Sequence, residues 1–102
     1  MTGILLLLQR CSKYCISAPV EVPVKFGIEN LDEVAFVEME FYDGSRPIRA
    51  DILYPPSFIN NIYEYTYEFD EVMSDTITIV RTIYAHDRSW VEYIDKRRIT
   101  CY

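Results

Sequence analysis

The stretch Ile62-Tyr63-Glu64-Tyr65-Thr66-Tyr67-Glu68-Phe69 decides the fold class of this 102-residue chain. Aromatic side chains alternate in it with glutamate and threonine. Successive side chains of a strand point to opposite faces, so this repeat of two predicts a β-strand with one apolar face.

Three further segments show strand patterns on either side of this stretch. Residues 20–26 alternate valine and phenylalanine with polar residues, residues 34–42 alternate less cleanly, and residues 76–84 are rich in β-branched side chains. Asp43-Gly44 predicts a turn, and Pro55-Pro56-Ser57 predicts a break in the chain. We therefore predict an α+β protein that is mainly antiparallel β.

The helical part of that prediction lies near residues 89–98. Ser89 and Glu92 have the Ser-x-x-Glu spacing of a capping box, and residues 96–98 are basic, which suits the last turn of a helix. The same stretch also alternates as a strand would. Of the two alternatives, the spacing favours a short helix.

Pro23 lies within the alternating segment 20–26. Proline has no backbone N–H to donate to a neighbouring strand, so we expect this segment to be an edge strand, or Pro23 to lie at its start. An unprotected edge strand can pair with another chain.

The chain also contains a weak internal repeat. A shift of 43 residues places Glu21 on Glu64 and Phe26 on Phe69, with the strand phases matched. We therefore expect one domain over residues 1–102, with a pseudo-repeat at about 20–54 and 63–97. A lone hairpin is marginally stable in water, so two similar hairpin-based motifs would pack together and leave a groove between them.

Composition and charge exclude several classes of protein. Half of the residues are hydrophobic, which excludes intrinsic disorder, and no apolar run is long enough to span a membrane. The net charge is −6, and residues 21–75 hold thirteen acids against three bases. Such a segment repels nucleic acid, so we expect neither nucleic-acid nor membrane partners.

The termini indicate an intracellular protein. The apolar run at residues 4–8 is short for a secretory signal and fits a buried strand better. Cys11, Cys15 and Cys101 are an odd number and lack the further ligands that a zinc site needs. We expect buried or free thiols, with a disulfide to Cys101 as the alternative.

No catalytic motif stands out, and we predict a non-enzymatic protein without cofactor or metal. His86 and Asp87 are neighbours, but adjacent strand residues point apart. Glu38 and Glu40 share one strand face, as do Glu64 and Glu68, and paired carboxylates could serve a hydrolase. A solvated polar face explains them better, so an enzyme ranks last.

Tyrosines are the strongest candidates for a binding surface, because tyrosine is enriched at protein interfaces. The candidate groove residues are Tyr63, Tyr65, Tyr67, Tyr42, Tyr84, Val22 and Val24. A packed core is an equally good interpretation of the tyrosine stripe. The predicted function is a protein–protein interaction module that binds an extended peptide or protein segment in the groove between the two similar motifs, either by strand addition or by docking in the seam. The alternative is an acidic decoy that inhibits a host nucleic-acid-binding protein. The chain would be a monomer or a homodimer.

The chain resembles the small orphan proteins of crenarchaeal viruses. The resemblance rests on the length, the Ile- and Tyr-rich strands such as residues 62–69, the single Gln9 and the apparent two-fold repetition. It implies a viral product in the cytoplasm of a hot archaeal host, without an assigned activity and without family site residues to transfer.

Overall fold

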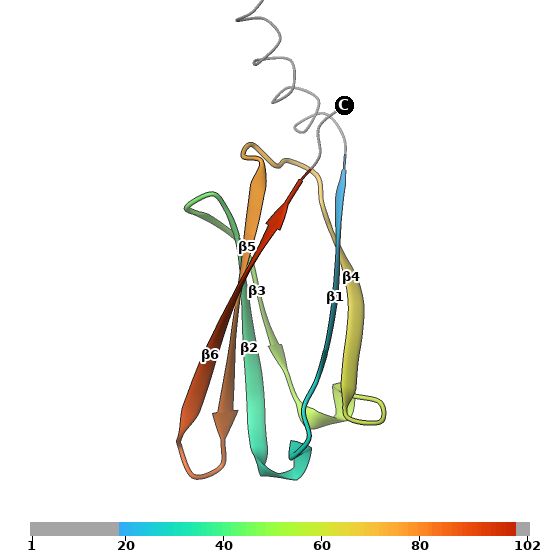
Figure 1. Cartoon of the computed structure of the whole chain (residues 1–102), viewed down its shortest axis with the longest axis vertical. Helices are drawn as coiled ribbons and strands as arrows, with labels where there is room; N and C mark the ends of the chain where they lie inside the picture. Colours follow the sequence, from blue (N-terminus) through green and yellow to red (C-terminus); the bar gives the residue numbers. More distant parts are fainter. Residues whose placement is uncertain (1–18, 100–102) are drawn as a thin grey trace, which may run out of the picture.

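The computed structural model describes residues 19–99 and builds them almost entirely from antiparallel strands (Figure 1). There are two short 3₁₀ turns, η1 (Leu31–Glu33) and η2 (Pro55–Ser57). The six strands are β1 (Val20–Gly27), β2 (Val34–Asp43), β3 (Arg46–Leu53), β4 (Ile62–Phe69), β5 (Thr76–Ala85) and β6 (Trp90–Arg98).

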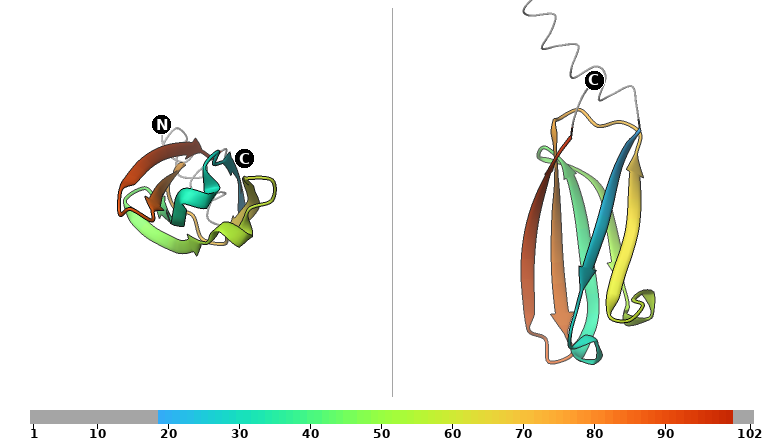
Figure 2. Two further views of the ribbon diagram at one scale, coloured as in Figure 1. Left: turned by 90° about the horizontal axis from the view of Figure 1, so that it is seen from below. Right: turned by 45° about the vertical axis from the view of Figure 1, so that its right-hand side comes forward.

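The strands form two facing sheets of unequal width (Figure 2). The small sheet pairs β1 with β4, and the large sheet has the order β3-β2-β5-β6. Each sheet takes strands from both halves of the chain. Residues 20–54 and 63–97 therefore do not form separate layers, because β1 and β4 pair with each other across the halves.

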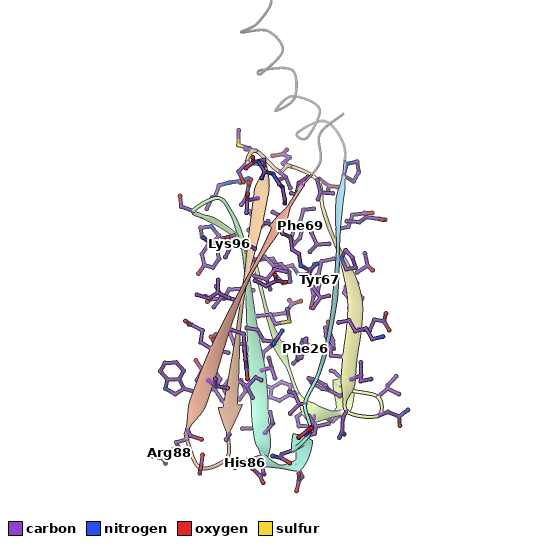
Figure 3. All side chains as sticks on the ribbon, viewed as in Figure 1. Phe26, Tyr67, Phe69, His86, Arg88 and Lys96 are labelled. Atoms are coloured by element: carbon purple, nitrogen blue, oxygen red, sulfur yellow. The ribbon has the colours of Figure 1, made fainter. Side chains whose placement is uncertain are left out.

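The core lies between the sheets and follows the alternation of the strands. The large sheet contributes Val37, Met39 and Phe41 from β2, all fully buried. Tyr67 and Phe69 of β4 pack on Phe41, with ring centroids 4.5 and 5.4 Å from its ring. Figure 3 shows Tyr67 and Phe69, together with Phe26 of β1, between the sheets.

The mainly antiparallel β prediction is confirmed, and all four predicted strands are present within a residue or two. The Asp43-Gly44 turn is confirmed as well, with Gly44 at φ +63°, a conformation that glycine adopts without strain. Pro23 lies on an edge strand, since within residues 19–99 β1 pairs with β4 alone.

The helix predicted near residues 89–98 is wrong, because this segment is strand β6. It pairs along its whole length with β5, from Tyr84 opposite Trp90 to Thr76 opposite Arg98. A capping box satisfies only backbone N–H groups in the first turn of a helix. A full ladder with the β-branched strand β5 gives hydrogen bonds to the N–H and C=O groups of every second residue of β6. The α+β class is therefore replaced by a β class. The predictions for residues 4–8, Cys11, Cys15 and Cys101 lie outside the described residues.

A buried carboxylate holds one end of the large sheet together. Asp43, the last residue of β2, accepts hydrogen bonds from the backbone N–H groups of Met73 and Ser74, both at 2.8 Å. Its Oδ2 also lies 2.7 Å from Arg46 Nη2. Burial alone would raise the pKa of Asp43, but the bond from Met73 and those from Arg46 and Ser74 outweigh it and lower the pKa to about 2.

This pKa predicts an acid-dependent loss of stability. A carboxyl group with a lowered pKa in the folded state stabilises the fold above its unfolded pKa, near 4, and the contribution disappears as the pH falls from about 4 to about 2. Asp43→Asn should lower the free energy of unfolding at pH 7 by about 1–3 kcal/mol. Chemical denaturation of both proteins should show this difference shrinking between pH 4 and 2. A difference independent of pH would contradict the role of the charge.

Candidate functional site

Three of the predicted groove residues belong to the core. Val22, Val24 and Tyr67 are buried between the sheets, so a partner could not reach them without separating the sheets. Burial raises the pKa of Tyr67, and its hydroxyl lies 2.7 Å from that of Tyr63. For Tyr67, the interpretation of the tyrosine stripe as packed core is therefore the correct one.

Tyr63 and Tyr65 are less buried than Tyr67, although all three side chains lie on the inner face of β4. Tyr63 is half-buried against Phe26 and Phe58, while Tyr65 is exposed and meets the Tyr67 ring edge-on at 4.9 Å. The guanidinium of Arg49 on β3 lies 5.0 Å from the Tyr67 ring. The tyrosine stripe thus runs from the buried Tyr67, which contacts Arg49 of β3, to the exposed Tyr65.

Tyr42 and Tyr84 lie on the opposite face of the large sheet, which we call the outer face. It consists of the side chains of β2, β3, β5 and β6 that point away from the small sheet. Glu40 raises the pKa of Tyr42, while partial burial and then Glu38 raise that of Tyr84. These two tyrosines therefore share no groove with Val22 and Val24.

The acidic residues do not converge on one surface. Glu38, Glu40 and Glu92 lie on the outer face of the large sheet, whereas Glu21 and Glu68 lie opposite each other on the outside of the small sheet. Among residues 19–99, no three His, Cys, Asp or Glu side chains are placed to hold a metal ion. His86 is exposed in the turn between β5 and β6.

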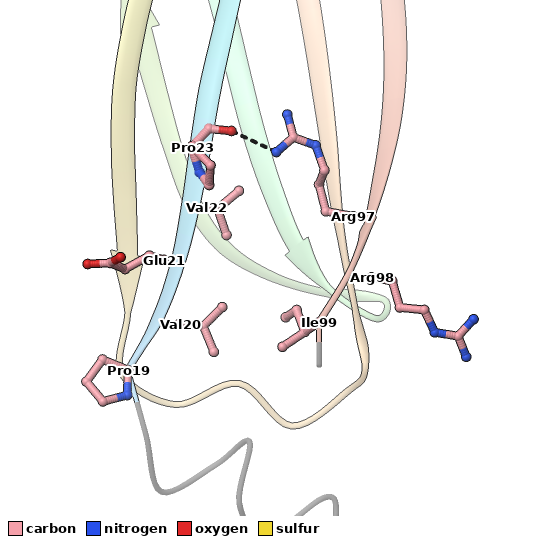
Figure 4. Close-up of a pocket in the computed structure, with 8 residues that line it drawn as sticks. All are labelled: Pro19, Val20, Glu21, Val22, Pro23, Arg97, Arg98 and Ile99. Carbon is pink, nitrogen blue, oxygen red and sulfur yellow. Dashed lines mark hydrogen bonds between the residues drawn. The ribbon is translucent and has the colours of Figure 1, made fainter. Parts of the chain in front are cut away.

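One end of the seam between β1 and β6 borders an open pocket of about 340 Å³. Figure 4 shows Val20, Val22 and Ile99 lining it, while Arg97 reaches across and Arg98 points away. Arg97 Nη1 donates to the carbonyl oxygen of Pro23 at 2.7 Å. This carbonyl points away from β4, so the missing N–H of Pro23 removes no bond from the β1–β4 ladder.

Arg81 fills the middle of the same seam. Its guanidinium lies 4.2 Å from the ring centre of Phe26 and 4.7 Å from that of Tyr93. Burial lowers its pKa, and its buried Nε has no hydrogen-bond partner among the described residues. The sequence shows an arginine in the middle of an apolar strand. It does not show which aromatic rings contact this arginine, because they come from β1 and β6.

Strand β6 is an edge of the large sheet, and its outward backbone groups can be identified. Ala85 donates to Ser89 O and Ile99 donates to Asp75 O at the two ends of the β5–β6 ladder. Hydrogen-bonded pairs alternate along an antiparallel ladder, so odd-numbered residues of β6 bond to β5. The even-numbered residues point their N–H and C=O groups outward: Trp90, Glu92, Ile94, Lys96 and Arg98.

The side chains of β6 are exposed on both faces of the strand. Trp90 and Ile94 on the outer face are each 62% exposed, and Val91 and Tyr93 on the inner face are nearly half exposed. An edge strand that exposes large apolar side chains and that no other described residue covers is a site at which proteins pair with other chains.

The other edge strands each bury at least one residue of one face, whereas eight of the nine residues of β6 are exposed. Pro23 removes a donor from the outward edge of β1, and Glu64 and Glu68 place charges along that of β4. The outward residues of β3, Ala50 and Ile52, carry no charge, and the neighbouring Leu53 is buried in the core. The free edge of β6 is therefore the candidate site.

No protein-family model, curated protein or solved structure matches this chain. Among the described residues, the structure contains no helix of the length and apolar character that crossing a membrane requires.

The buried Nε of Arg81, which has no hydrogen-bond partner among the described residues, gives a prediction about the seam between β1 and β6. Arg81→Met should leave the free energy of unfolding unchanged or raise it by about 1–2 kcal/mol, because replacing a buried charge by an apolar side chain of similar size removes its desolvation cost. Met39, directly opposite on β2, already occupies the corresponding inner position. Urea denaturation measures the effect, and a loss above about 1 kcal/mol would mean that the ring contacts outweigh burial.

Proposed function

We propose that this chain is a non-enzymatic protein–protein interaction module that binds an extended protein segment along the free edge of β6. Binding adds a strand to the large sheet. The backbone supplies affinity, and alternate side chains supply specificity.

The observation that carries the proposal is an edge strand that no other described residue pairs with and that exposes its side chains. The five even-numbered residues of β6 turn both their backbone groups and their side chains to the outside. Glu92 and Lys96 are charged, but neither forms an ion pair with another described residue. A complementary segment therefore presents a base near Glu92 and an acid near Lys96.

We further propose that residues 20–54 and 63–97 are two similar three-strand units. The supporting observation is the register of the two hairpins. Val37 pairs with Leu53, and Ile79 pairs with Asp95, so the β5–β6 register is the β2–β3 register moved by 42 residues. Met39 and Arg81, which face each other at the centre of the large sheet, are also 42 residues apart.

The unit arrangement supports a role for the edges rather than for a groove. In this arrangement β3 and β6 are equivalent strands at the two edges of the large sheet. Of these two strands, only β6 has charged residues among those that point outward. Acids on several surfaces give less support to the acidic decoy, because a phosphate mimic needs a single array.

A displayed library of random nine-residue peptides tests the proposal with the chain at a concentration at which it is monomeric. We expect selected peptides to perturb the amide resonances of the even-numbered residues of β6. Ile94→Pro should weaken their binding by about tenfold or more, because it removes an outward N–H donor and obstructs pairing without removing a β5–β6 bond.

Ile52→Pro is the matched control. Ile52 is also exposed, at 53%, and also points its backbone outward, but it lies on β3. It should leave peptide binding within about twofold, and thermal unfolding should show that both variants fold. Selected peptides that map to another surface, or that bind Ile94→Pro as well as the wild type, would contradict the proposed edge.

A further inference from the structure

We infer that the segment bound by β6 is β6 of a second copy of this chain, so that two large sheets join into one continuous antiparallel sheet. This inference rests on the proposed function and names its partner. It requires that the edge of β6 be complementary to itself under a two-fold axis.

The register that satisfies this condition has Ile94 on the axis. Ile94 is the middle residue of β6, so the nine-residue strands overlap completely. Ile94 then lies opposite Ile94 of the second copy, Glu92 opposite Lys96, and Trp90 opposite Arg98. Every even-numbered residue turns its N–H and C=O groups outward, so all of these are hydrogen-bonded pairs.

The side chains of this register are complementary at every level of the outer face. Two Glu92–Lys96 pairs lie symmetrically around the apolar Ile94 pair, and opposite charges directly across a ladder are favourable. At each end, an Arg98 guanidinium meets the exposed Trp90 ring, which is the preferred aromatic partner of a cation. Arg98 has one exposed ion pair within its own chain, with Asp75 at 3.6 Å, and such a pair contributes little.

Other registers fail either on charge or on hydrogen bonding. An axis through Glu92 or Lys96 keeps the hydrogen-bond pattern but places like charges opposite each other at the centre. An axis through Tyr93 or Asp95 directs backbone groups that already bond to β5 toward the partner. The same test applied to β3 gives the uncharged outward residues Ala50 and Ile52, which fix no register.

The isologous arrangement needs room beside the end of β6 as well as its middle. Among the described residues, the pocket between β1 and residues 97–99 leaves open space there, and the side chain of Arg98 points away from it (Figure 4). Lys96 and Arg98 are both exposed. Pairing also brings the Trp90 and Ile94 side chains of both copies onto one continuous outer face, which reduces their contact with water.

Charge reversal on the full-length chain tests the inference. We expect sedimentation equilibrium to show a wild-type mass that rises with concentration from 12.1 kDa toward twice that value. Glu92→Lys and Lys96→Glu should each weaken the dimer by about tenfold or more, because each places like charges across both symmetric pairs. An equimolar mixture of the two variants should form a heterodimer, and the double variant should again form a homodimer. Glu64→Lys, an acid at an exposed edge of the small sheet, is the matched control and should leave the dimer unchanged.

The outcomes separate this inference from the proposed function. A wild type that stays at 12.1 kDa up to about 1 mM overturns the second copy as partner, as does a mixture that fails to restore the dimer. If displayed peptides still bind the edge of β6 in an Ile94-dependent manner, the proposed function survives this failure. If Ile94→Pro affects neither the dimer nor peptide binding, both fail.

Discussion

The packing of the β1–β4 pair on the inner face of the four-stranded sheet is the contact on which the rest of the structure depends. Two strands alone are marginally stable in water, so β1 and β4 persist because their apolar side chains are buried against β2 and β5. Tyr67 and Phe69 on Phe41 form the centre of that contact. Since both sheets draw strands from both halves, neither half can keep its fold without the other.

The unequal width of the two sheets explains where the exposed edge arises. A sheet of two strands cannot cover all of a sheet of four, so the edge strand β6 extends beyond the core. Arg81 and Arg97 partly fill the seam on the β6 side through contacts with Phe26 and with the Pro23 carbonyl. Within residues 19–99, the outward backbone groups of β6 have no partner strand, and their position follows from the fold rather than from any motif.

The sequence predicted much of the fold and little of the site. Alternation located β1, β2, β4 and β5 because each buries one face, and this burial leaves a period of two. Strand β6 was missed because both of its faces are exposed, so its pattern lacks an apolar side and matched a capping box instead. The tyrosine stripe was identified correctly as a shared face, but sequence alone cannot tell that the facing layer is Phe41. Which backbone groups point outward depends on the pairing register, which no single strand encodes.

The most direct test of the free edge is amide hydrogen exchange measured by NMR at the lowest practical concentration. The amides of Glu92, Ile94 and Lys96 should exchange rapidly, whereas those of Val91, Tyr93 and Asp95, which bond to β5, should be protected. Equal protection of all six amides in the dilute chain would show that the outer edge of β6 is already paired within the molecule, which contradicts the binding site proposed for it.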